Sequence, residues 1–345
     1  MNFPYLSQAK APLTCVVGAV NEFGDQISVS IPAERALTVY VDKRELVTLM
    51  TLGAHPELLV LGYLLNQRLV NSVEDLESIT VDWDVGAAAV KSRHGIADIE
   101  EKTSRRVVTT GCGQGSVFGG LMDEVDQIKL PADTSITQSQ LYALVNTIRL
   151  KETTYKSAGS VHACALFGTK SLSGSVPEML IFVEDVGRHN AIDTIAGWMS
   201  IFLVPKLASA HKGSPPDCAG IPGGSLLEDN SPDSPDSPDS PDSPDSPDSS
   251  DSSDSSALFA EINQLVFYTT GRLTSEMVIK SAQMGVPIVV SRSGITQMGH
   301  QVAQAVGLCA IGRATNKRFV CYTSPQRLAL EPGLAGAKPD IGKLV

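Results

Sequence analysis

One segment of this sequence cannot take part in a packed core. Six Ser-Pro-Asp triplets fill residues 231–248, and two Ser-Ser-Asp triplets follow and end at Asp254. Proline at every third position removes backbone donors and favours extended chain, while the aspartates repel one another. Such a segment buries no apolar surface, so we expect residues 213–256 to be a disordered insertion. It is either a repeat tolerated in a surface loop or an acidic docking segment.

The same segment accounts for the acidity of the chain. The formal net charge is −11, but eleven of the 38 acidic residues lie in residues 213–256, which hold no Lys or Arg. The other residues carry 27 acidic and 27 basic side chains and are neutral as a whole. We therefore expect no nucleic-acid binding through a broad basic face.

The sequence carries no pattern typical of export or membrane insertion. No apolar stretch approaches the roughly 20 residues of a membrane span, and the first residues lack a basic region followed by an apolar one. The six cysteines are scattered without a Cys-x-x-Cys pair, which indicates reduced thiols. We expect a cytoplasmic protein that does not bind a membrane. Cys15 and Cys321 fall in strand patterns and are interpreted as core residues.

The first part of the chain predicts a β-rich α+β domain, placed at residues 1–136. Pro56 opens a mostly apolar stretch that runs to Leu65 and predicts a buried helix. Short apolar runs between turn residues are typical of strands. They lie at residues 14–20, 27–31, 37–41, 46–52, 79–81 and 106–109.

The second part predicts an α/β domain at residues 137–330, interrupted by the insertion and followed by a tail at 331–345. Thr137 is placed to cap an amphipathic helix over 138–150. Strands are expected at 161–167, 179–183, 265–270, 287–291, 308–312 and 319–323. Further helices are expected at 191–199, 275–284 and 297–306. This alternation favours a sheet with helices on its faces.

Arginines stand at four of the expected strand ends, namely Arg188, Arg272, Arg292 and Arg313. Ligands of open α/β sheets sit outside the carboxyl ends of strands, where helix N-termini favour anions. Any single arginine could be a surface charge, but their recurrence indicates a pocket for phosphate or pyrophosphate. We include Arg188, His189, Gly271 and Arg272 among the predicted contacts. The sequence has neither a P-loop nor a Gly-x-Gly-x-x-Gly fingerprint.

Two further residues are candidates for chemistry. Cys112 lies between glycines just after an expected strand, where backbone N–H groups can approach a thiolate and lower its pKa. An unreactive loop thiol is the alternative. His162 is either a buried imidazole or a proton donor that faces the anion pocket.

A protein-ligated metal is not expected. The triplet His162-Ala163-Cys164 is faintly similar to the His-x-Glu element of zinc deaminases, but their Pro-Cys-x-x-Cys element is missing from this sequence.

Four segments together resemble the formate dehydrogenase accessory sulfurtransferase (FdhD) family. They are EDVGRHNAID at 184–193, SVHACALF at 160–167, TTGRLTSEMVIKSAQMGVPIVVSRSG at 269–294 and KRFVCYTSPQRL at 317–328. The resemblance implies a sulfur carrier required for formate dehydrogenase activity. Such a sulfurtransferase accepts sulfur from a cysteine desulfurase as a persulfide on a loop cysteine. It then transfers the sulfur to the bis(molybdopterin guanine dinucleotide) molybdenum cofactor before that cofactor is inserted into formate dehydrogenase.

The same resemblance implies a fold and a set of contacts. The C-terminal domain is expected to have a cytidine deaminase-like α/β/α fold without zinc, and the protein is expected to be a homodimer. The loop cysteine of the family corresponds to Cys112. The cofactor-contacting turn of the family corresponds to Arg313, Ala314, Thr315, Asn316, Lys317 and Arg318.

The cysteine loop departs from the family pattern. The family loop usually reads Cys-Gly-x-Cys-Gly, whereas this chain has Cys112-Gly113-Gln114-Gly115-Ser116, so Gly115 replaces the second cysteine. We therefore predict a persulfide carrier with a single cysteine, because a neighbouring thiol that could release the sulfur through an internal disulfide is missing from the loop. The rival hypothesis is a chaperone that binds the molybdopterin cofactor without handling sulfur.

Overall fold

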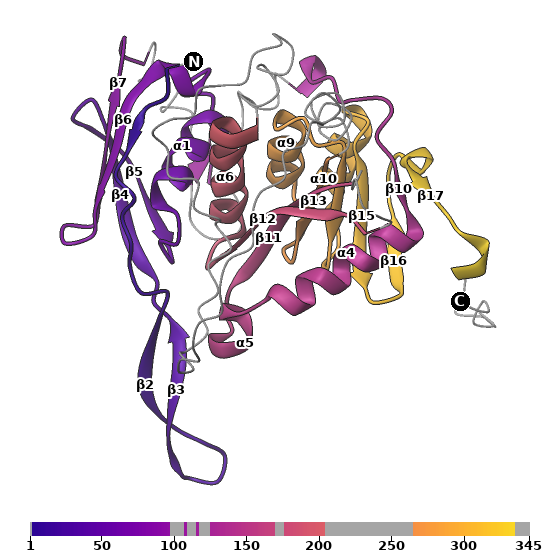
Figure 1. Ribbon diagram of the computed structural model, residues 1–345, viewed down its shortest axis with the longest axis horizontal. Helices are drawn as coiled ribbons and strands as arrows, with labels where there is room; N and C mark the ends of the chain where they lie inside the picture. The colour runs from indigo at the N-terminus through magenta and orange to yellow at the C-terminus, as the bar shows by residue number, and fades with distance from the viewer. Residues whose placement is uncertain are drawn as a thin grey trace, which may run out of the picture.

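The computed structural model describes residues 2–96, 107–108, 115–116, 125–169, 176–203 and 265–334. Within this part of the chain, two sheets enclose a central layer of helices, and a further helix covers the outer face of the second sheet (Figure 1). The mixed α/β class predicted from the sequence is therefore confirmed, while the cytidine deaminase-like comparison stays a prediction. The insertion at 213–256 and Cys112 lie outside the described residues.

The first sheet has five strands in the order β1-β6-β7-β4-β5. Their bounds are β1 Tyr5–Leu6, β4 Arg35–Val41, β5 Arg44–Thr51, β6 Leu76–Asp82 and β7 Ala87–Ser92. A tight turn joins β4 to β5, with positive φ at Asp42 (47°) and Lys43 (72°), the conformation that suits the twist of a hairpin. Helix α1 (Pro56–Asn66) packs its apolar side chains on this sheet to form the first core.

A two-stranded arm projects from this sheet (Figure 1). It consists of β2 (Thr14–Val20) paired antiparallel with β3 (Gln26–Pro32). The sequence predicted both strands, at 14–20 and 27–31, but not their pairing. The arm leaves much of its apolar surface in solvent, and Val16 and Phe23 are 73% and 80% exposed. Cys15 on the arm is exposed as well, so its interpretation as a core residue is wrong. A strand pattern alone does not show whether a second layer covers the strand.

The second sheet has six strands in the order β12-β11-β13-β14-β15-β16. Their bounds are β11 His162–Gly168, β12 Glu178–Asp185, β13 Leu265–Thr269, β14 Ile288–Ser291, β15 Cys309–Thr315 and β16 Arg318–Cys321. The strands β13, β14 and β15 are parallel, whereas β11, β12 and β16 pair antiparallel with their neighbours. As a result, the start of β11 lies at the same edge as the carboxyl ends of β12, β13 and β14.

Helices cover both faces of the second sheet. Helices α6 (Arg188–Trp198), α9 (Ser275–Gln283) and α10 (Gln297–Ala305) pack on the face that looks toward the first sheet. Helix α4 (Gln138–Lys151) packs on the opposite face and is capped by Thr137, whose hydroxyl accepts from the N–H of Gln140. None of the helices among the described residues is long and apolar enough to span a membrane.

Several short elements complete the described part of the chain. Their bounds are α5 Thr154–Ala158, β8 Val107–Val108, β9 Gly115–Ser116, β10 Ile136–Thr137 and β17 Leu328–Ala329, with single turns at Val73–Asp75, Val125–Gln127, Met199–Leu203, Pro325–Arg327 and Pro332–Leu334.

Two glycines bring α1 and α6 into direct backbone contact. A Cβ on Gly62 of α1 would collide with the carbonyl oxygen of Asp193, and a Cβ on Gly197 of α6 would collide with that of Leu58. These two helices join the first sheet to the second (Figure 1). The boundary predicted near residue 136 stays a prediction.

Candidate functional site

Several polar residues meet at one edge of the second sheet. His162 begins β11 and is paired in register with Asp185, the last residue of β12. The neighbouring strands β13 and β14 end at Thr269 and Ser291, which are paired with each other. Each of β12, β13 and β14 is followed by a helix that starts near this edge. In open α/β sheets this is the edge where ligands bind.

Three arginines follow the strands that end at this edge, and each acts electrostatically on His162. Its imidazole is half-buried, and burial together with the positive charges of Arg188, Arg272 and Arg292 lowers its pKa. Because these three arginines follow strands that end at the same edge of the sheet, they concentrate positive charge there, which favours a bound anion. We call His162, Arg188, Arg272 and Arg292 the arginine cluster. The cluster contains three of the four arginines that the sequence predicted at strand ends.

Arg188 enters the cluster from a helix. The sequence predicted α6 to begin at Ala191, but it begins at Arg188, so Arg188, His189 and Asn190 form its first turn. Arg188 is only 3% exposed. Its side chain passes over Gly271, where a Cβ would lie 2.6 Å from the Cδ of Arg188. Gly271 therefore makes room for the side chain of Arg188. The sequence predicted a cofactor contact at Gly271, not this packing role.

Arg292 is held by a second group of contacts. Its Nη1 lies 3.1 Å from Oε1 of the buried Glu152, and its guanidinium stacks 5.3 Å from the centre of the Tyr155 ring. Arg272, by contrast, is exposed at the start of the loop before α9. The sequence placed Arg292 at a strand end, but we did not include it among the predicted cofactor contacts. The same strand-arginine-helix layout that selected Arg188 and Arg272 could have identified it.

Arg313 connects the predicted turn to this edge through its backbone. Its N–H donates to the carbonyl oxygen of Ser293 at 2.7 Å, and its φ is +53°, where non-glycine residues are strained. The strand β15, predicted to end at Gly312, continues through Arg313 and Ala314 to Thr315, with an irregular register that turns the side chain of Arg313 outward. Such irregularities often redirect a side chain beside a site.

The rest of the predicted turn lies at the tip of the β15–β16 hairpin. Four of its residues are exposed, whereas Ala314 packs into the core beneath α4. The exposed residues are Thr315, Asn316, Lys317 and Arg318. The carbonyl oxygen of Lys317 accepts from the hydroxyl of Tyr142 at 3.3 Å, which fixes the tip against α4. Contact of these residues with a cofactor stays a prediction, as does the role of Cys112, outside the described residues.

The acidic residues beside the cluster hold its framework. Asp185 accepts from the hydroxyl of Thr51 at 2.5 Å, the N–H of Leu52 at 3.1 Å and the amide of Asn190 at 2.8 Å, which ties β5 to the start of α6. Burial raises the pKa of Asp185, while these hydrogen bonds oppose the shift. Glu184 accepts from the N–H groups of Thr154 at 2.8 Å and Tyr155 at 3.0 Å. Sequence reasoning missed both roles.

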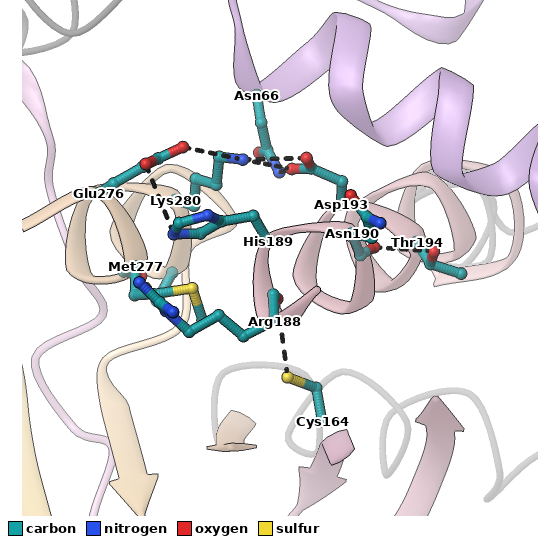
Figure 2. Close-up of polar contacts among 11 residues, drawn as sticks. Asn66, Cys164, Arg188, His189, Asn190, Asp193, Thr194, Glu276, Met277 and Lys280 are labelled. Carbon is teal, nitrogen blue, oxygen red and sulfur yellow. Dashed lines mark hydrogen bonds and ion pairs between the residues drawn. The ribbon is translucent and has the colours of Figure 1, made fainter. Parts of the chain in front are cut away.

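His189 belongs to a buried network behind the cluster (Figure 2). Its Nε2 lies 3.5 Å from Glu276, and Nζ of Lys280 lies 3.4 Å from Glu276 and 2.9 Å from Asp193. Asn66 on α1 donates to Asp193 at 2.7 Å. Burial lowers the pKa of His189 to about 3, so the ring is neutral at physiological pH. Its predicted contact with a cofactor stays a prediction.

Thiols and metal ligands are arranged as follows in the described residues. Cys164 is buried behind the cluster, with Sγ 3.3 Å from the hydroxyl of Thr269, and burial raises the pKa of its thiol to about 12. Among these residues, no group of three His, Cys, Asp or Glu side chains could hold a metal ion.

Comparisons with known proteins agree over most of the chain. The model of the FdhD/NarQ family matches residues 32–205 and 258–329. The sulfur carrier protein FdhD of Bacillus subtilis (strain 168) is 24% identical over 311 residues, which cover 90% of this chain and 93% of that protein. The sulfur carrier protein FdhD of Bacillus pumilus is 25% identical over 301 residues, which cover 86% and 88%.

A solved structure shares the fold. It is a crystal structure from Desulfotalea psychrophila, described as a candidate formate dehydrogenase accessory protein. It superposes with a TM-score of 0.58 at 18% identity, over 92% of this chain and 100% of that one.

Proposed function

Because the chain belongs to the FdhD/NarQ family, we propose that it is a sulfur carrier required for formate dehydrogenase activity. Two relatives that cover most of its length are named sulfur carrier protein FdhD. The observation that carries the proposal to a specific site is the arginine cluster, in which Arg188, Arg272 and Arg292 follow strand ends at one edge of the sheet and all act electrostatically on His162.

The substrate that we propose for this edge is the bis(molybdopterin guanine dinucleotide) molybdenum cofactor. Its phosphates are polyanionic, and planar guanidinium groups bind phosphate through paired charge-assisted hydrogen bonds. Arg188 is preorganised by burial, and Arg292 is preorganised by Glu152 and Tyr155, so little side-chain freedom is lost when the anion binds. Arg313 and the exposed turn to Arg318 extend the positive surface along β15.

Cys112 is the residue that we propose to carry the sulfur. Its thiolate attacks the terminal sulfur of the persulfide on a cysteine desulfurase, forming an S–S bond on Cys112 and releasing the desulfurase cysteine as a thiolate. This exchange needs no external oxidant, because one persulfide is consumed for each one formed. When that S–S bond breaks with its electron pair left on Cys112, Cys112 would return as a thiolate and the sulfur would leave at the sulfane level. The bound cofactor would supply the two electrons that make it a sulfide ligand. Formate dehydrogenase is the partner served, and we propose a cytoplasmic homodimer.

The test is a mass measurement on the full chain. After incubation with a cysteine desulfurase and cysteine, we expect a gain of about 32 Da, one sulfur atom, on the peptide that contains Cys112. Cys112→Ala should abolish both this gain and the maturation of formate dehydrogenase, whereas Cys15→Ala, on the exposed arm, should abolish neither. Cofactor binding without the mass gain would instead favour the chaperone hypothesis. Normal maturation by Cys112→Ala would rule out sulfur transfer by this residue.

A further inference from the structure

Two thiols meet on the face of the second sheet that α4 covers. The Sγ atoms of Cys309 on β15 and Cys321 on β16 lie 3.8 Å apart. In the register of this antiparallel pair, Cys321 lies opposite Ile311, two residues from Cys309. The two cysteines are therefore diagonal neighbours whose side chains point to the same face. In Figure 1 these two strands lie side by side at the edge of the sheet.

The two thiols have different environments. Cys309 is fully buried in the core beneath α4, whereas Cys321 is only half-buried. The Cys321 thiol donates to the carbonyl oxygen of Thr323 at 3.4 Å, which leaves its sulfur free to accept from Cys309. The hydrogen bond from Cys309 lowers the pKa of Cys321, and the same bond together with burial raises the pKa of Cys309. Cys321 is thus the nucleophile and Cys309 its proton-bearing neighbour.

From this geometry we propose that Cys309 and Cys321 form a redox-active pair that a hydroperoxide converts to a disulfide between β15 and β16. The Cys321 thiolate attacks one peroxide oxygen, the O–O bond breaks, and the leaving oxygen takes a proton and departs as water when the oxidant is hydrogen peroxide. The Cys309 sulfur then attacks the sulfenic sulfur of Cys321, and the hydroxyl leaves as a second water. The thiols lose two electrons in total, and the peroxide gains them.

The contact distance fits a resting dithiol. A disulfide needs its sulfurs about 2.0 Å apart and its Cα atoms within about 7 Å, whereas diagonal neighbours of an antiparallel pair lie about 7–8 Å apart. Closing the pair therefore needs a small shift of β16, an edge strand that has a neighbour on one side only. The disulfide would fix the base of the hairpin that carries Arg313 and Arg318. This site does not include Cys112 among its residues and does not depend on the sulfur-carrier proposal.

The sequence makes the disulfide easy to detect. Trypsin cleaves after Arg292, Arg313, Arg318 and Arg327, so Cys309 and Cys321 fall in different peptides, 293–313 and 319–327, each with a single cysteine. The full chain is treated with hydrogen peroxide, quenched with acid, alkylated with N-ethylmaleimide in denaturant, and digested. We expect a peptide pair joined at these cysteines, about 2 Da lighter than the summed thiol forms and separated by dithiothreitol.

Two variants sharpen the test. With Cys321→Ser we expect the joined peptides to disappear and Cys309 to be recovered as the alkylated thiol. With Cys15→Ser, which removes an exposed cysteine far along the chain, we expect the joined peptides in wild-type yield. Wild-type protein decides the question even if Cys321→Ser does not fold. Recovery of both peptides fully alkylated, after a peroxide dose that has oxidised Cys15, would overturn the proposal, and so would disulfides that join either cysteine to a different partner.

Discussion

Lys280 and Asp193 form an ion pair at 2.9 Å in which neither side chain is more than 1% exposed. Lys280 on α9 also lies 3.4 Å from Glu276, while Asp193 on α6 accepts from Asn66 on α1. Burial alone would lower the pKa of Lys280, but the two carboxylates raise it, so the ammonium stays charged. One cation therefore compensates two buried acidic groups where three helices meet.

Removing this cation should be costly. We expect Lys280→Met to lower the free energy of unfolding by about 3–5 kcal/mol, because Asp193 and Glu276 then remain buried without their cation. Asp193→Asn should cost less, since Glu276 still faces Lys280. Urea unfolding measures both. The control is Lys91→Met at an exposed ion pair with Glu77, expected to change stability by less than about 1 kcal/mol. Equal losses for the two lysine variants would contradict this account.

The neutral state of His189 makes stability depend on pH. Its pKa is about 3 in the folded chain, below the value of about 6.5 in an unfolded chain, so the unfolded state binds more protons in acid. The stability from the neutral ring is fully present above pH 6.5 and is lost as the pH falls toward the folded pKa. When the pH falls from about 7.5 to about 5.5, protonation linked to His189 should lower the free energy of unfolding by about 1 kcal/mol.

The variant His189→Gln isolates this contribution. It should show a smaller loss of unfolding free energy between the two pH values than the wild type, and His300→Gln on α10 serves as the matched control. Because buried carboxyl groups such as Asp185 have raised pKa values and act in the opposite direction, the difference between variants is the informative quantity. Identical pH profiles for wild type and His189→Gln would show that His189 is not held neutral by the fold.

The arginines at the sheet edge should bind a nucleoside diphosphate. With GDP as the probe in calorimetry, we expect Arg272→Ala and Arg313→Ala each to weaken binding by about 1–3 kcal/mol, the range of a charge-assisted hydrogen bond. Both residues are exposed, so neither change should disturb the fold. Arg149→Ala, an exposed arginine on α4 that donates to Asn146, should leave the affinity unchanged. Unchanged affinity in both edge variants would count against the anion site.

The crossing of α1 and α6 should not tolerate a side chain at Gly62. A methyl group there meets the backbone of Asp193 and Gly197, which cannot rotate away, so Gly62→Ala should cost about 3 kcal/mol or more in thermal or urea unfolding. Gly18→Ala on the β2–β3 arm is the control, because a Cβ there meets no atom within 4 Å. A loss of similar size at both positions would show that the close approach of the helices is not what matters.

Local sequence patterns predicted most elements to within a few residues. The strand Thr14–Val20 and the helix from Pro56 match the structure, because apolar spacing and turn residues are local signals. The start of α6 was missed because its first turn is polar, and Asn190 is buried there through bonds to Met50 and Asp185. Met50 lies far from Asn190 in the chain, so the spacing of apolar residues around Asn190 could not predict this contact.

The candidate site was predicted in the same uneven way. Strand-end arginines could be located because each follows an apolar run, and three of them act electrostatically on His162. The extension of β15 through Arg313 depends on a left-handed residue bonded to Ser293, which no local preference of arginine favours. The roles of Glu184 and Asp185 were missed because carboxylates at a strand end are equally compatible with catalysis, ligand binding and framework contacts.

Glu184 and Asp185 are adjacent, yet they fasten different parts of the arginine cluster. Asp185 secures the turn that presents Arg188, and Glu184 secures α5, whose Tyr155 lies beneath Arg292. In a genetic screen, changes at either carboxylate should therefore reduce the amount of intact protein in the cell along with its activity. Complementation assays on Glu184 and Asp185 variants need immunoblots beside them. A null phenotype there would reflect loss of these framework hydrogen bonds and of folded protein, rather than loss of a reactive group.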